Sequence, residues 1–304
     1  MSEQSSVVPE FAAASPAVVQ ATRPMYWSVR RELWENRSIY LAPLLVAAVV
    51  MFGFVLSTIG MPHRRRATLL LAPAQQHTTI AMPFDIAAAM LVVTAFVIGI
   101  FYCLDALQGE RRDRSILFWK SLPVSDRTTV LAKTSIPLLA LPAFTFVIIV
   151  LTQWFMLLWS TAVLLPSGLA GSTWMHFHWF TQSMLVFYCL IVLVLWHAPI
   201  YALLLLISSW ARRGSYLWAV LPPLAIAAVE KIVFNTAYFG SFLKYRLIGG
   251  IGEAFIFKAP HGTDSLSRLT PLNFLSTPGL WIGLILAAIF ITLAVRLRRD
   301  REPV

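Results

Sequence analysis

Charged residues are scarce in this chain of 304 residues. Asp, Glu, Lys and Arg make up 12% of the sequence, against about 25% in a typical soluble domain. After Lys133 no charged residue occurs until Arg212. A helix crosses a bilayer with about 20 apolar residues, so this charge-free stretch is long enough for more than one crossing. The scarcity of charge excludes an ordinary soluble domain and predicts an integral membrane protein.

Cysteines and metal-ligand clusters are also rare. Cys103 and Cys189 both lie in apolar runs and no C-x-x-C pair occurs, so we expect small buried side chains and no disulfide framework. His176 and His178 are two residues apart without a third ligand nearby, and their aromatic surroundings are typical of a membrane interface. We therefore expect no metal site.

Nucleotide-binding and catalytic patterns are missing from the sequence. No G-x-x-x-x-G-K-[ST] segment occurs, so the chain lacks a phosphate-binding loop of its own. No Ser-His-Asp arrangement and no paired catalytic carboxylates can be identified. We expect neither a catalytic residue nor a cofactor in this chain, which is predicted not to be an enzyme.

Basic residues exceed acidic ones, with a formal net charge of +10. They gather at the ends of apolar runs, where they meet anionic lipid headgroups and fix orientation. This distribution predicts the lipid bilayer as a partner and argues against nucleic acid.

The apolar runs predict an all-α protein with six transmembrane helices. The predicted spans are Ile39–Ile59, Phe84–Leu107, Ile136–Leu158, Ser183–Ser209, Leu217–Tyr238 and Leu280–Leu297. We expect one transmembrane domain over 1–304, with a tail and interfacial helix in 1–38, spans in 39–297 and a tail in 298–304. With both termini inside, sixteen Lys and Arg residues face the cytoplasm and seven face outward.

A helix lying on the inner membrane surface is predicted before the first span. Trp27 and Trp34 are seven residues apart, with Arg30 and Arg31 between them. The alternative is an ordinary aromatic and basic flank of the span.

Two connections have no assigned fold. The connection Met61–Pro83 is long and basic, and its role stays open. The connection Phe239–Pro278 is compatible either with re-entrant or interfacial short helices or with a small folded outer loop.

Ionisable residues within spans are candidates for a translocation path or gate. Glu230 and Lys231 lie past the middle of the fifth span, and His197 lies near the middle of the fourth. We favour structural pairing or snorkelling for the first two, and a neutral, hydrogen-bonded helix contact for His197.

A charged island between the second and third spans carries the most specific pattern. Ser115 is placed to cap a short helix over Ile116–Leu122, Pro123 ends it, and Ser125 starts another helix. A short amphipathic helix in this position fits a groove on a partner protein. A compact loop packed on its own helix ends is the alternative.

The segment Leu107–Asp126, with its Glu-Arg-Arg-Asp-Arg-Ser, apolar stretch and Ser-Leu-Pro, resembles the first cytoplasmic loop of bacterial ABC transporter type-2 permeases. Leu275–Gly283 and the later Arg296-Leu-Arg-Arg are also similar to these transmembrane subunits. The resemblance extends to the layout of most of the chain, although the connection Met61–Pro83 departs from it. It implies a coupling helix that touches an ATPase subunit through Glu110, Arg111, Arg112, Arg114, Phe118, Trp119, Lys120 and Asp126.

The resemblance also implies partners and a function. Two copies of a separate ATPase subunit would bind ATP and Mg, and a second permease subunit, identical or a paralogue, would pair with this one. We expect an exporter in the bacterial inner membrane that moves an amphipathic drug, antimicrobial peptide or lipid. A membrane-embedded lipid-modifying enzyme and a non-transporting sensory or scaffold subunit are the alternatives.

Overall fold

The computed structural model describes residues 23–112, 124–211, 213–255 and 269–300. Within these ranges the chain is helical apart from short connections, and a single β-bridge joins Phe255 to Leu269. Six helices are long and apolar enough to cross a membrane. The predicted all-α class and the predicted number of long apolar helices are therefore confirmed.

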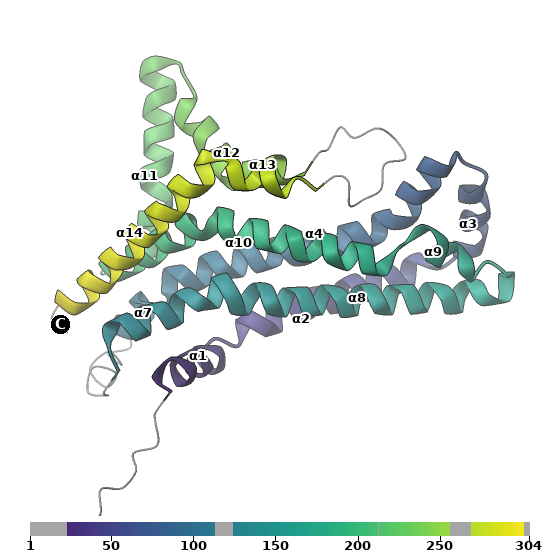
Figure 1. The fold of residues 1–304 in the computed structure, drawn as a ribbon, viewed down its shortest axis with the longest axis horizontal. Coiled ribbons are helices and arrows are strands. Elements are labelled where there is room, and N and C mark those ends of the chain that lie inside the picture. The colour runs from purple at the N-terminus through teal and green to yellow at the C-terminus, as the bar shows by residue number, and fades with distance from the viewer. Residues whose placement is uncertain (1–22, 113–123, 212, 256–268, 301–304) are drawn as a thin grey trace, which may run out of the picture.

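Four of these helices form an elongated bundle, and a fifth packs along it (Figure 1). They are α2 (Ser38–Ser57), α4 (Pro73–Asp105), α8 (Leu141–Leu164), α10 (Trp179–Trp210) and α14 (Pro278–Asp300). α10 contacts α4, α8 and α14, so it lies at the centre of the packing.

The connection between the first two spans is mostly helical. α3 (Met61–Leu69) follows a left-handed turn at Gly60, and α4 begins at Pro73, well before the predicted Phe84. Pro73 is at the first helical position, where its missing N–H costs nothing. The first turns of α4 contain Gln75, Gln76 and His77, which form helix readily but are invisible to a search for apolar runs.

The third span is longer than predicted. α7 (Asp126–Ser135) leads through a π-helical turn, η1 (Ile136–Ala140), into α8. Pro137 and Pro142 cannot donate backbone hydrogen bonds, and the wider π turn accommodates this loss. A 3-10 turn, η2 (Leu165–Ser167), and α9 (Gly171–His176) then connect α8 to α10.

Separate buried clusters hold the two ends of the bundle. At one end Ile39, Cys103, Ile136 and Leu205 bring α2, α4, η1 and α10 together. At the other end Phe54 and Met156 pack with Phe84 and Phe177, whose rings stack with centroids 4.0 Å apart. The core therefore runs the length of the bundle.

The fifth apolar helix departs from the bundle. α11 (Ser215–Val229), continued by the π turn η3 (Glu230–Phe234), rises away from the other helices in Figure 1. None of its most apolar window is buried. α12 (Tyr238–Ala254) returns to contact Trp196 and His197 at the middle of α10, and α13 (Pro271–Ser276) precedes α14. The described part of the connection Phe239–Pro278 is thus largely helical, and its placement relative to a membrane stays a prediction.

Candidate functional site

Four segments that are distant in sequence meet at the end of the bundle where the chain's C-terminus lies (Figure 1). They are α1 (Pro24–Glu35), α5 (Gln108–Arg112), α7 and the last turns of α14. Their charged side chains Glu32, Lys133, Glu110 and Arg298 are only 1%, 2%, 8% and 7% exposed. We call these four residues the ionic cluster.

Every charge in the ionic cluster has an opposite charge beside it. The Lys133 Nζ atom lies 2.8 Å from Glu32 Oε1 and 3.1 Å from Glu110 Oε1. The Arg298 Nη1 atom lies 2.6 Å from Glu110 Oε2, and its Nε lies 2.9 Å from Asp126 Oδ1. Glu110 therefore connects α5 to both α7 and α14.

α1 enters the same cluster through one face. The Arg31 Nη2 atom lies 2.8 Å from Glu32 Oε1 and 3.3 Å from Glu110 Oε1. Tyr102 Oη, from α4, donates to Glu32 Oε2 at 2.9 Å. Burial opposes the charge of Arg31, but its bond to Glu32 and the neighbouring carboxylates outweigh burial and raise its pKa.

Local sequence signals position Lys133 of the cluster and Asp126, which pairs with Arg298. Ser125 caps α7 by accepting a hydrogen bond from the Thr128 N–H at 3.1 Å. Seven residues make two helical turns, so Asp126 and Lys133 lie on the same face of α7. The predicted helix start at Ser125 is confirmed.

A single hydroxyl fixes the turn between α4 and α5. Ser208 Oγ accepts hydrogen bonds from the Leu107 and Gln108 N–H groups, both at 3.0 Å. Ser208 itself is fully buried in α10. This contact directs Glu110 into the cluster.

The arrangement is suited to transmitting motion. A buried charge without its partner costs about 3–5 kcal/mol, so no helix of the cluster can move away alone. A shift of α7 would displace Lys133 from carboxylates on α1 and α5 at once. The cluster therefore links α1, α5, α7 and α14 through shared ion pairs.

The predicted coupling residues fall into three groups. Glu110 and Asp126 are brought together by Arg298. Arg112 is exposed and its Nη1 lies 3.6 Å from Asp105 Oδ1. The Arg111 side chain and the whole of Arg114, Phe118, Trp119 and Lys120 lie outside the described residues, as does the predicted helix Ile116–Leu122.

Three members of the cluster were not predicted as site residues. Arg298 belongs to the segment 298–304 that is predicted as a tail, and in the structure α14 continues to Asp300 and Arg298 is buried. The sequence does distinguish Lys133, because it is the last charged residue before the long apolar run. Glu32 lies on the face of α1 opposite Trp27, and this position on the helix could also have identified Glu32 as a site residue.

The predicted interfacial helix exists as α1. Trp27 and Trp34 are exposed, and the Arg30 guanidinium lies 5.3 Å and 4.6 Å from their ring centroids. Arg30 and Arg31 therefore have different environments, because Arg31 pairs with Glu32 and Glu110 of the ionic cluster. The placement of α1 on a membrane surface stays a prediction.

The three predicted path residues do not converge. His197 lies between carbonyl oxygens of Leu193, 2.8 Å away, and Leu247, 3.0 Å away, so it joins α10 to α12. Glu230 accepts from Thr236 Oγ1 at 2.9 Å and from the Phe239 N–H at 2.8 Å, which caps the start of α12. Lys231 is exposed.

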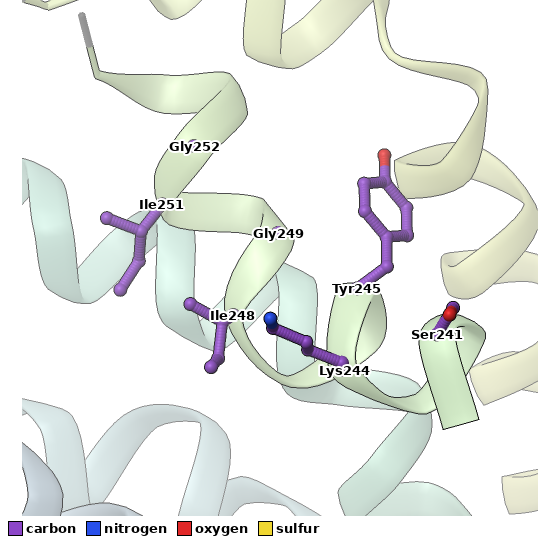
Figure 2. Close-up of a pocket in the computed structure, with 7 residues that line it drawn as sticks. All are labelled: Ser241, Lys244, Tyr245, Ile248, Gly249, Ile251 and Gly252. Carbon is purple, nitrogen blue, oxygen red and sulfur yellow. The ribbon is translucent and has the colours of Figure 1, made fainter. Parts of the chain in front are cut away.

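A shallow hollow of about 390 Å³ runs along α12 (Figure 2). Its lining residues all belong to that helix and are Ser241, Lys244, Tyr245, Ile248, Gly249, Ile251 and Gly252. The hollow includes one cation, Lys244, and does not coincide with the predicted path residues. It therefore adds no support to a path through His197, Glu230 and Lys231.

No protein-family model, no curated protein and no solved structure matches this chain.

Metal-ligating side chains do not gather in the described part of the chain. No group of three His, Cys, Asp or Glu residues there is arranged to hold a metal ion. His176 instead bonds Ser172 O at 2.8 Å and Gln76 Oε1 at 3.0 Å, which joins α9 to α4. The ionic cluster is the strongest candidate for a functional site.

Proposed function

We propose that the chain is the membrane-spanning permease subunit of an ABC exporter. The supporting observation is the ionic cluster, because it connects both ends of the segment 113–123 to the rest of the bundle. Glu110 precedes this segment, Asp126 follows it, and both bind Arg298. The segment also carries the resemblance to the coupling loop of type-2 permeases.

In the proposed mechanism, ATP and Mg bind to two copies of a separate ATPase subunit. Movement of that subunit pushes the segment 113–123, and the cluster passes the displacement to α1 and α14. The π turn η1, between α7 and α8, is a point where the third span can bend. Nucleotide then biases the bundle between two packings, which alternate access for the substrate.

The proposed orientation places the ionic cluster in the cytoplasm of a bacterial cell, with both termini on that side of the inner membrane. Exposed arginines gather at this end of the bundle, in agreement with the preference of positive residues for the cytoplasmic side. They are Arg23, Arg37, Arg127, Arg213, Arg296 and Arg299.

The proposed assembly contains a second permease subunit, identical or a paralogue. α11 is apolar on all sides and unburied within one copy, which suits contact with lipid or with a second subunit. An amphipathic substrate suits the apolar, aromatic helices, since these contain few charges to bind a strongly polar one. This assignment of substrate depends on the resemblance.

Affinity purification of the full chain in mild detergent tests the proposal. The triple variant Arg114→Ala/Phe118→Ala/Trp119→Ala should lose a co-purifying ATPase, because these side chains would occupy its groove. The matched control is Arg66→Ala/Trp174→Ala/Phe180→Ala, which removes the same exposed residue types at the opposite end. Retention of the ATPase by the first variant would refute the docking assignment.

Two further measurements separate the alternatives. ATP-dependent substrate movement in vesicles containing both subunits would exclude a scaffold role. Lipid turnover that needs no ATPase, and that is abolished by His197→Leu/Glu230→Leu/Lys231→Leu, would favour a lipid-modifying enzyme.

A further inference from the structure

The face of α1 that points away from the ionic cluster combines cationic and aromatic side chains. Trp27 and Trp34 are 57% and 65% exposed. The guanidinium of Arg30 lies over both indole rings, with centroid distances of 5.3 Å and 4.6 Å. We call Trp27, Arg30 and Trp34 the outer face of α1.

Arg30 and the two arginines that flank α1 lack the carboxylate partners that Arg31 has among the described residues. Arg31 is bound to Glu32 and Glu110. Among the described residues, no carboxylate lies within ion-pair distance of Arg30 or of the exposed Arg23 and Arg37. Arg23, Arg30 and Arg37 follow one another at intervals of seven residues, and none of them has a carboxylate partner among the described residues.

The position of α1 is restricted from two directions. Only Asn36 and Arg37 separate it from α2, so Glu35 lies within about 11 Å of Ser38 at the start of the first apolar helix. On the other side, Glu32 and Arg31 hold α1 against α7 and α5. The outer face is therefore turned away from the bundle and held next to the end of a span.

We propose that the outer face of α1 binds anionic phospholipid headgroups. The Arg30 N–H groups would donate to the lipid phosphate, and stacking on two indoles orders the guanidinium beforehand. Indole rings favour the headgroup depth of a bilayer. Arg23 and Arg37 add attraction to the negatively charged leaflet.

Lipid bound at this face also acts on the ionic cluster. Arg30 and Arg31 are adjacent on a short helix, so fixing the outer face fixes the position from which Arg31 reaches Glu110. Anionic lipid thereby favours the arrangement in which Arg31 pairs with Glu110. This inference goes beyond the proposed function and does not require an ATPase.

Lipid titration of the full chain in mild detergent tests the inference. Native mass spectrometry would count bound phosphatidylglycerol and, separately, bound phosphatidylcholine. Arg30→Gln should weaken phosphatidylglycerol binding about fivefold, as expected for one arginine near an anionic surface, and leave phosphatidylcholine unchanged. Arg30→Lys should have an intermediate effect, because it keeps the charge but loses the planar stacking.

Arg66→Gln is the matched control, since it removes a solvent-accessible arginine at the opposite end of the bundle. Equal phosphatidylglycerol affinity for Arg30→Gln and Arg66→Gln would overturn the proposal. Loss of a co-purifying protein from Arg30→Gln, with lipid binding intact, would also overturn it and assign the face to a protein partner. If Arg30→Gln does not fold, the comparison of Arg30→Lys with Arg66→Lys decides in the same way.

Discussion

The two ends of the helical bundle are held together by different kinds of contact. At the ionic cluster, four buried charges share partners across α1, α5, α7 and α14. At the opposite end the described residues form no ion pair of Lys or Arg with a carboxylate, and the polar contacts are hydrogen bonds, such as that of Gln182 Nε2 with Asp85 Oδ1 at 2.7 Å. One end is therefore held by shared ion pairs, whereas the other is held by hydrogen bonds in which at most one group is charged.

Two arginines, one at each end, illustrate this difference in contacts. Arg65, at the opposite end, is buried with a single hydrogen bond to Thr173 Oγ1 at 3.3 Å, and burial lowers its pKa. Arg31 also loses solvent, yet Glu32 and Glu110 raise its pKa despite burial. Neighbouring carboxylates therefore stabilise the charged form of Arg31, whereas burial destabilises the charged form of Arg65.

Lys133→Met should have the largest effect, because it leaves Glu32 and Glu110 without their shared cation. We expect a loss of ~3–5 kcal/mol in the free energy of unfolding, measured by thermal unfolding of the full chain in detergent. Lys244→Met, which removes an exposed lysine from α12, should change stability by less than ~0.5 kcal/mol. Equal melting of both variants would show that the cluster does not hold the bundle.

A double-mutant cycle between Glu110 and Arg298 tests whether the cluster is connected. Glu110→Gln and Arg298→Gln should be non-additive, with a coupling energy of ~2–3 kcal/mol in unfolding experiments. The same cycle on Asp85 and Gln182 should give less than ~1 kcal/mol, since that pair is exposed. Similar coupling in the two cycles would remove the contrast between the ends.

Two substitutions in α12, which packs against the middle of α10, test packing rather than charge. A Cβ atom at Gly250 would lie 2.5 Å from the Trp196 ring, whereas one at Gly252 would meet open space. Gly250→Ala should cost ~1–2 kcal/mol through overpacking, and Gly252→Ala should cost nothing measurable. The thermal unfolding of the two variants, compared side by side, measures how firmly α12 contacts α10.

The smallest effect is expected at the opposite end. Asp85→Asn keeps a hydrogen-bond acceptor for Gln182 and removes an exposed charge. We expect a change below ~0.5 kcal/mol in the free energy of unfolding. A loss comparable with that of Lys133→Met would mean that the opposite end is as strongly coupled as the ionic cluster.

Features encoded by nearby residues could be predicted from the sequence. Apolar runs predict the six long helices, and the residues around Ser125 predict the start of α7. The early start of α4 was missed because Gln75 and Gln76 interrupt the apolar pattern without interrupting the helix.

The ionic cluster depends on contacts that no local spacing reveals. Glu110 and Arg298 are 188 residues apart, and Lys133 and Glu32 are 101 apart. Glu110 and Asp126 were predicted as coupling residues, but their common partner at the end of α14 was not. A single sequence marks which charges are unusual and leaves their pairing undetermined.

The distance along the chain between Glu110 and Arg298 has a consequence for biosynthesis. At about 5–20 residues per second, the ribosome adds the intervening 188 residues in roughly 10–40 s. During that interval Glu110 has Lys133 but not Arg298. The buried ion pairs of the nascent protein are therefore complete only after α14 has emerged. A truncated product without α14 would leave Glu110 without Arg298, which is a defect that quality-control proteases can recognise.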